Sequence, residues 1–266
     1  MDIFTYTFMQ RAFIAGIIVA LMCPLIGTFI VIKRQSLLGD GLGHIAFAGV
    51  TGASLLNLYP PLGAAGLTVL AAMGIEWVRR RQSQYVDMIM ALFFYAGLAL
   101  AVIFSSITNI PSTSLLNFLF GSILTVTDAD IYSIILAALV VAVLMKYIYS
   151  RLLVTAFDEE VAKVGGVAVN RVNMIFAILT ALVVVMGMSV VGILLISALM
   201  IIPVASAHLW HVGFAKTLWI AEAYAVGAVI AGLFGAFYFD IAPGGTIVMT
   251  AIALYILTFV LSYGRR

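Results

Sequence analysis

Nine long apolar runs, separated by charged or turn-forming residues, follow one another along this chain. A helix needs about 20 mostly apolar residues to cross the hydrocarbon core of a bilayer. The runs predict an all-α fold, a polytopic bundle of transmembrane helices, because a helix satisfies its own backbone hydrogen bonds in lipid. We expect the spans at Ala12–Ile32, Gly41–Leu58, Leu62–Val78, Met88–Ile107, Ile131–Tyr149, Val172–Met188, Val190–Leu209, Thr217–Phe237 and Thr246–Ser262.

The composition excludes an ordinary soluble domain. Hydrophobic residues make up 65% of the 266 residues and charged residues 9%, and the mean hydropathy is +1.23. Soluble domains carry about 25% charged residues, because their surface faces water. These charges are too few to cover a globule of this size, so its surface is expected to face lipid. We treat residues 1–266 as a single transmembrane domain.

The basic residues indicate an orientation. They gather in the loops near Lys33, Arg79 to Arg81, Arg151 to Arg171, Lys216 and Arg265, whereas residues 59–61, 108–114 and 240–245 contain no lysine or arginine. A shorter stretch, Leu115–Val126, falls short of a span and is expected to be re-entrant or buried. If it does not cross, every basic loop lies on one side, which the positive-inside rule makes the cytoplasm. The N-terminus is then outside and the C-terminus inside; eight spans instead of nine stays open.

The largest hydrophilic loop, residues 150–171, is expected to contain a short helix. Asp158 can cap its start, acidic residues follow in the first turn, and Gly166 can end it. A short helix in a cytoplasmic loop is a natural docking element for a motor subunit. A solvated connector is the alternative.

The strongest candidate for binding chemistry is the segment 39–44, Gly-Asp-Gly-Leu-Gly-His, at the start of the second span. Asp40 and His44 are four residues apart, so on a helix they share a face. Carboxylate with imidazole suits zinc, manganese or ferrous iron. Two ligands are too few for tight structural binding, which fits a site that releases its ion. Alternatively, Asp40 caps the helix and His44 forms an interface hydrogen bond.

Other polar or helix-bending residues are less specific. His208 and His211, three apart at the end of the seventh span, lie beside a tryptophan and near a lysine, which favours a membrane-interface position over a metal site. Glu222 lies within the eighth span, where a carboxyl group is expected to face the bundle or a polar cavity, and it is a candidate for an additional pathway residue. Pro203 is expected to kink its helix.

Absent motifs restrict the function. The chain has no GxxxxGK[ST] motif for nucleotide phosphates and no HExxH motif of zinc proteases. Its single cysteine, Cys23, excludes an internal disulfide. The run Gly187 to Gly192 resembles a GxSxG nucleophile elbow only loosely, being one residue too long, so an intramembrane hydrolase using Ser189 is the weakest hypothesis.

Several stretches together resemble the permease family of bacterial ABC importers for zinc and manganese. The most specific are Lys33 to His44 (KRQSLLGDGLGH) and Ile201 to Ser206 (IIPVAS). Weaker matches follow the chain nearly end to end: FMQRA at 8–12, LIGTF at 25–29, LFGSIL at 119–124, FDEEVA at 157–162, VGILL at 191–195 and PGGTIV at 243–248.

The resemblance implies a homodimeric permease with a type II-like importer fold in the bacterial inner membrane. Two cytoplasmic ATP-binding subunits and an extracytoplasmic metal-binding protein would be its partners, with lipid around it and no nucleic acid. It implies no permanently bound cofactor, Zn2+ or Mn2+ as cargo, and a metal pathway through Asp40 and His44. The overall likeness of the segment around Pro203 and of the final span favours zinc.

The resemblance also assigns the loop 150–171 to coupling, with its residues 158–166 facing the ATPase. Asp158, Glu160, Ala162 and Gly166 are the coupling residues it implies. Two positions depart from the family. His208 stands where many relatives have arginine or another residue, and Ser122 stands where relatives often have aspartate, so neither receives a role. The rival hypothesis is a proton-coupled secondary metal carrier with Glu222, Asp40 and His44 as its relay.

Overall fold

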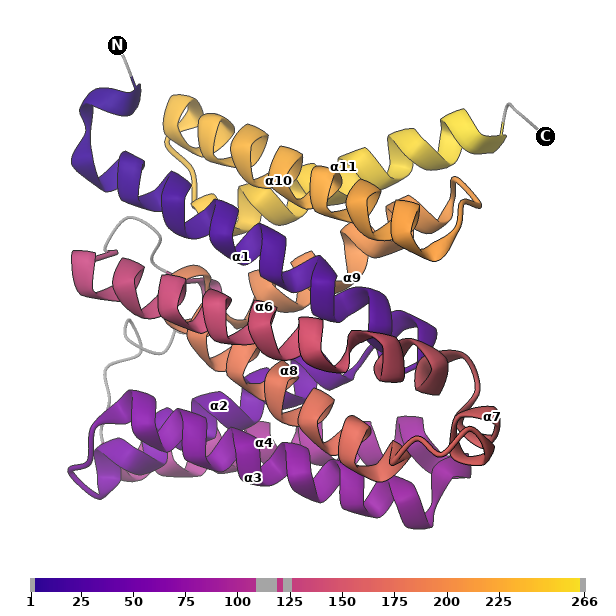
Figure 1. The fold of residues 1–266 in the computed structure, drawn as a ribbon. Helices are drawn as coiled ribbons and strands as arrows, with labels where there is room; N and C mark the ends of the chain where they lie inside the picture. Colours follow the sequence, from indigo (N-terminus) through magenta and orange to yellow (C-terminus); the bar gives the residue numbers. More distant parts are fainter. Residues whose placement is uncertain (1–2, 109–118, 122–125, 264–266) are drawn as a thin grey trace. The chain divides into compact units, whose positions relative to one another are not determined.

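In a computed structural model of the chain, residues 3–108, 119–121 and 126–263 are described. These residues form helices joined by turns, without a strand, which confirms the all-α prediction (Figure 1). The helices are α1 (Thr7–Ile32), α2 (Leu38–Leu55), α3 (Pro60–Arg81), α4 (Val86–Thr108), α6 (Asp128–Phe157), α7 (Glu159–Val164), α8 (Val169–Val191), α9 (Ile193–His208), α10 (Phe214–Phe239) and α11 (Pro243–Tyr263), with short 3-10 turns η1 (Ile3–Thr5) and η2 (Ser83–Tyr85).

Each of the nine expected spans coincides with one long helix. Within the described residues, seven of these helices (α1, α3, α4, α6, α8, α10 and α11) are long and apolar enough to cross a membrane. Helix α9 is apolar but, with 16 residues, too short to be counted. Helix α2 also fails the combined requirement of length and apolar composition. The membrane-spanning character is therefore supported, whereas eight to nine spans stays a prediction. Most of the stretch Leu115–Val126 lies outside the described residues.

The chain divides into two compact units, and α1, α6 and α8 contribute to both. Unit 1 contains residues 1–31, 117–138 and 187–266, and unit 2 contains residues 32–116 and 139–186. In unit 1, helices α9, α10 and α11 pack against one another. Helix α1 approaches α9 so closely that a Cβ atom on Gly27 would lie 1.9 Å from the carbonyl oxygen of Met200. The lack of a side chain at Gly27 thus allows the backbones of α1 and α9 to come into direct contact.

A break at Gly192 separates α8 from α9. Gly192 has a φ of +83°, and Gly121, which lies against it, has a φ of +78°. A Cβ atom on Gly121 would lie 2.3 Å from the carbonyl carbon of Val191, and one on Gly192 would lie 2.3 Å from the amide nitrogen of Gly121. Only glycine combines this backbone conformation with so close an approach. The sequence places the gap between these spans at Ser189, but α8 continues to Val191, and the break follows at Gly192, where glycine allows the turn.

In unit 2, α2 packs against both α3 and α4 (Figure 1), and most of its residues are buried. Helix α3 begins at Pro60, where proline is favoured because the first turn needs no amide donor. It ends in Arg79, Arg80 and Arg81, which suit the negative end of the helix dipole. The arginines we placed in a loop thus form the last turn of α3.

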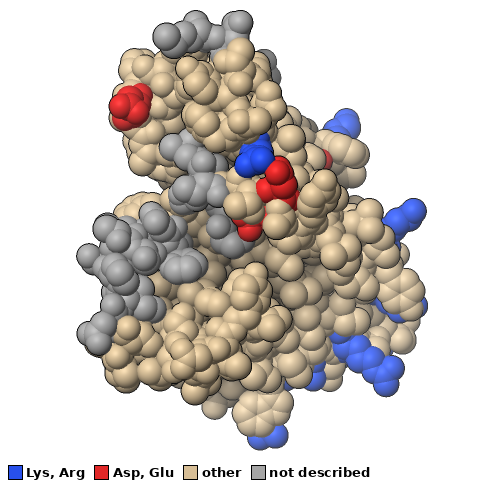
Figure 2. Space-filling view, turned by 90° about the vertical axis from the view of Figure 1, so that its left-hand side faces the viewer, with Lys and Arg blue, Asp and Glu red and all other residues tan. Residues whose placement is uncertain are grey.

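Uncharged residues cover most of the face shown in Figure 2, and its charged side chains are few. Large apolar side chains are exposed along several helices, among them Leu92 of α4, Leu136 of α6 and Val260 of α11. A soluble protein rarely exposes so much contiguous apolar surface. This surface therefore agrees with the lipid-facing surface expected from the composition.

Candidate functional site

Asp40 and His44 lie in the first two turns of α2, in unit 2. Between residues 38 and 50 they are the two half-buried positions in an otherwise buried stretch of helix. The spacing of four residues places both on one face, as the sequence predicts. Over residues 38–50 that face is the least enclosed side of α2, because the other positions of this stretch are buried.

The ring of His44 is held by Phe94 of α4 and retains an unsatisfied nitrogen. The two rings meet edge to face, with their centroids 4.6 Å apart. Among the described residues, the buried Nδ1 atom of His44 has no hydrogen-bond partner. The carboxylate of Asp40 acts on the same imidazole electrostatically. A buried ring nitrogen without a partner is costly, and a divalent cation shared with Asp40 would satisfy it.

The other residues singled out in the sequence do not join this pair into a larger cluster. In the part of the chain that the structure describes, no three His, Cys, Asp or Glu side chains are grouped closely enough to hold a metal. Glu222 is half-buried on α10, in unit 1. Helix α9 continues through Pro203 to His208, and the Nδ1 atom of His211 lies 2.9 Å from the carbonyl oxygen of Leu209. Within the described residues, Asp40 and His44 could therefore supply at most two protein ligands to a metal ion.

The short helix expected in the hydrophilic loop is present as α7, and its cap is the predicted one. The Oδ1 atom of Asp158 accepts hydrogen bonds from the amides of Glu160 and Val161, at 2.8 and 3.0 Å. The helix ends at Val164 with Gly165 as its C-cap, and Gly166 follows with a φ of +79°. Ala162 is fully buried, so α7 packs inward through this residue.

The outer face of α7 is apolar and exposed, which sequence reasoning missed. Phe157, Val161 and Val164 are all exposed, and Val164 retains 91% of its accessible surface. Val161 and Val164 are three residues apart and lie on one side of α7, and Phe157 is the last residue of α6, just before the cap at Asp158. Three large apolar residues within the most polar loop were the signal that could have revealed this surface.

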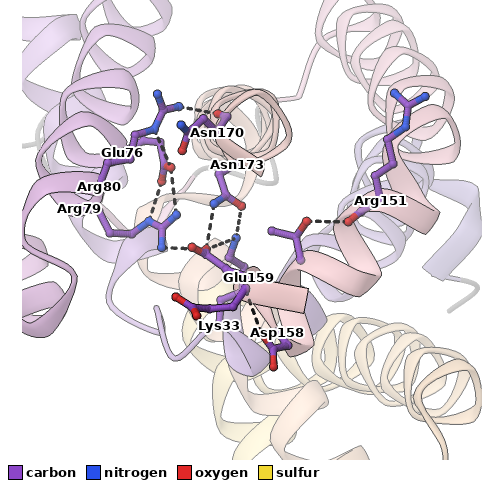
Figure 3. Close-up of polar contacts among 11 residues, drawn as sticks. Lys33, Glu76, Arg79, Arg80, Arg151, Asp158, Glu159, Asn170 and Asn173 are labelled. Atoms are coloured by element: carbon purple, nitrogen blue, oxygen red, sulfur yellow. Dashed lines mark hydrogen bonds and ion pairs between the residues drawn. The ribbon is translucent and has the colours of Figure 1, made fainter. Parts of the chain in front are cut away.

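The inner side of α7 faces a polar network, shown in Figure 3, in which Glu76, Arg79 and Asn173 are buried, Glu159 is half-buried and Arg80 is exposed. Arg79 of α3 lies between two carboxylates. Its Nε and Nη2 atoms donate to Glu76, at 2.8 and 3.0 Å, and its Nη1 atom donates to Oε1 of Glu159, at 3.1 Å. Glu76 also accepts from Arg80, at 3.3 Å, and Arg80 donates to the backbone carbonyl of Asn170. The sequence signal was a glutamate inside an apolar span with arginines three and four residues later.

Two further residues complete the network around Glu159. Its Oε1 atom accepts from Nδ2 of Asn173, at 2.9 Å, and lies 3.9 Å from Nζ of Lys33, which also donates to Oδ1 of Asn173. Burial and the nearby Arg79 lower the pKa of Lys33 from 10.5 to about 8, although Glu159 and Glu76 oppose this shift. Burial alone would raise the pKa of Glu159, but Arg79, Asn173 and Lys33 outweigh it and lower that pKa.

Comparison with known proteins gives matches along nearly the whole chain. The model of the ABC 3 transport family matches residues 5–262. The manganese transport system membrane protein MntC of Listeria monocytogenes is 31% identical over 254 residues, 96% of this chain and 90% of MntC. The high-affinity zinc uptake system membrane protein ZnuB of Haemophilus influenzae is 28% identical over 251 residues, 93% of this chain and 95% of ZnuB.

A solved structure agrees with these sequence matches. PsaBC from Streptococcus pneumoniae, determined in complex with Fab, superposes with a TM-score of 0.85 at 31% sequence identity. The match covers 96% of this chain and 91% of the other. Fold and sequence therefore point to the same group of metal-transport membrane proteins.

Proposed function

The chain belongs to the ABC 3 transport family, whose members include metal-transport membrane subunits, and from this premise we propose a specific role for it. It is the permease of an ATP-driven importer that receives a divalent transition metal from an extracytoplasmic binding protein and releases it into the cytoplasm. Residues 1–266 form one permease domain, which works as a homodimer with its C-terminus inside.

The observation that carries this proposal is the Asp40–His44 pair on the less enclosed face of α2. The unsatisfied Nδ1 atom of His44 and the neighbouring carboxylate provide a borderline and a hard ligand together. Such a pair binds first-row divalent metals and has little preference for sodium or potassium. With only two protein ligands the ion is held briefly, as a pathway requires.

Zinc is the cargo we favour, with manganese next. For a given set of nitrogen and oxygen ligands, divalent zinc binds more tightly than divalent manganese. Relatives named for each metal match this chain to a similar degree. Direct competition between the two ions during uptake would distinguish them.

The ATP-binding subunit docks on α7, and the coupling element is the segment 150–171, which comprises the end of α6, all of α7 and the start of α8. The exposed apolar face of Phe157, Val161 and Val164 supports this, because such side chains in a water-facing loop gain stability when a partner covers them. Asp158 caps the helix and Ala162 packs it inward, so both contribute by positioning that face. Glu160 is exposed beside it, and Gly166 permits the turn that follows.

The test is metal uptake by the reconstituted permease, ATP-binding subunit and binding protein. Asp40→Asn and His44→Gln should each lower uptake about 10-fold or more, which corresponds to losing about 1.4 kcal/mol of cation binding. Asp87→Asn and His208→Gln are matched controls, because both side chains are exposed. Normal uptake by both the Asp40 and the His44 variants would remove the proposed site.

The proton-coupled carrier is the second candidate, because Glu222 places a half-buried carboxyl group within an apolar helix. The same liposomes separate the two. Metal uptake by the permease alone, driven by a proton gradient without ATP-binding subunits, would favour the carrier and overturn the importer.

A further inference from the structure

The polar network beneath α7 connects four segments of unit 2 (Figure 3). Glu159 belongs to α7, Arg79 to the last turn of α3 and Asn173 to the first turns of α8. Lys33 belongs to the loop between α1 and α2. Each of the three partners is held through the same oxygen atom of Glu159. Glu159 is therefore the point at which α7 is fastened to the other three segments.

Stability alone does not explain why these residues are polar. Glu76 and Arg79 expose only 4% and 8% of their surface, and Asn173 is also buried. Buried ion pairs lose so much hydration that well-packed apolar residues are often equally stabilising. Charged hydrogen bonds, however, fix directions and distances that apolar contacts leave adjustable. The network therefore determines where α7 sits relative to the three segments.

Two routes lead from this network to the candidate metal residues. Lys33 lies five residues before the start of α2, and the loop between them is tight, since the amide of Leu38 donates to the carbonyl of Gln35 at 2.9 Å. Asp40 follows in the first turn of α2. The second route runs through α3, which carries Arg79 and packs along α2. A displacement of α7 would thus act on α2 in two places. It would act on the N-terminus of α2 through Lys33 and the α1–α2 loop, and along the length of α2 through α3.

We infer that Glu159 is a positioning residue that transmits movement of α7 to α2, and thereby sets the state of the Asp40–His44 pair. This inference rests on the proposed function, in which the ATP-binding subunit contacts the outer face of α7. In this scheme the ATP-binding subunit contacts the outer face of α7, and Glu159 transmits the resulting movement of α7 to α2. Removing the charge of Glu159 should then separate ATP hydrolysis from transport without detaching the motor.

Glu159→Gln is the sharpest perturbation, because glutamine keeps the shape and an acceptor for Asn173 but loses the charge that faces Arg79 and Lys33. We expect the ATP-binding subunits to remain bound and to hydrolyse ATP, while metal imported per ATP falls about 10-fold. Asp240→Asn is the matched control, an exposed carboxylate in unit 1 that forms no ion pair among the described residues. It should retain the wild-type ratio.

A second variant guards against misfolding of the first. Asn173→Ala leaves the Arg79–Glu159 ion pair intact but removes the link to α8 together with the hydrogen bond from Lys33, so a smaller fall in the ratio is expected. Hydrogen exchange provides a readout that a purely structural role would not change. In the wild-type complex, a non-hydrolysable ATP analogue should alter exchange of the amides at residues 38–44, and in Glu159→Gln this response should disappear.

The outcomes separate this inference from the function beneath it. If Glu159→Gln imports metal with the wild-type ratio, or loses uptake only in proportion to lost ATP-binding subunits, the positioning role is wrong while the importer stands. If the wild-type complex imports no metal, the proposed function fails first. A lowered ratio with an intact complex and a lost exchange response supports the inference.

Discussion

The approach of α1 to α9 at Gly27 predicts a loss of stability that can be worked out from the structure. In Gly27→Ala, the new Cβ atom would lie 1.9 Å from the carbonyl oxygen of Met200, whereas a carbon–oxygen contact needs about 3.3 Å. The helices would have to separate by about 1.4 Å, and because the obstacle is backbone, no side chain can rotate away. Overpacking of this kind costs about 3 kcal/mol, the upper end of the usual range. Alanine returns about 1 kcal/mol through its helix propensity.

The expected net loss is about 2 kcal/mol, which lowers the melting temperature by roughly 4–8 °C for a chain of this size. Thermal unfolding of the detergent-solubilised protein, followed by the fraction that stays monodisperse after heating, measures it. Gly227→Ala is the matched control, because a Cβ atom on Gly227 of α10 would meet nothing within 4 Å. That variant should equal or exceed the wild type. A Gly27→Ala protein as stable as Gly227→Ala would refute the reasoning.

Three further perturbations have defined outcomes. Asp158→Ala should destabilise α7 by about 1 kcal/mol and speed exchange of the Val161 amide about 5-fold, as read by hydrogen exchange; unchanged protection would contradict the cap. The pKa of Lys33 is lower in the folded than in the unfolded protein, so the wild type should gain stability relative to Lys33→Met as pH rises from about 8 to 10.5. A pH-independent difference in melting temperature would refute this. Tyr224→Phe removes a hydroxyl that accepts from Trp210 and lies 2.6 Å from Oγ1 of Thr258, and it should cost about 1 kcal/mol in the same melting assay. An unchanged melting temperature would show that these two contacts do not stabilise the fold.

Much of the fold was predictable because each long helix corresponds to one continuous apolar run in the sequence. The boundaries were less predictable, because local features decide them. Arg79 and its neighbours read as loop residues, yet their charges suit a helix C-terminus. The end of α8 could not be inferred from hydropathy, since it depends on a contact between Gly192 and Gly121, far away in sequence.

The candidate site shows the same division. Asp40 and His44 were recognisable because a spacing of four fixes their shared face, and the cap at Asp158 is equally local. The role of Glu159 was not visible, because its partners come from three other segments of the chain. Pair contacts of that kind are determined by tertiary packing, and a single sequence does not encode them in any short pattern.

The crossing of Gly121 and Gly192 has a consequence for how this protein can evolve. Each residue is confined by backbone atoms of the other segment, so a substitution at one cannot be compensated by a smaller side chain at its neighbour. Second-site suppressors of a mutation at either position should therefore be rare in a genetic screen. In related sequences whose lipid-facing residues differ widely, we therefore expect glycine at both of these positions.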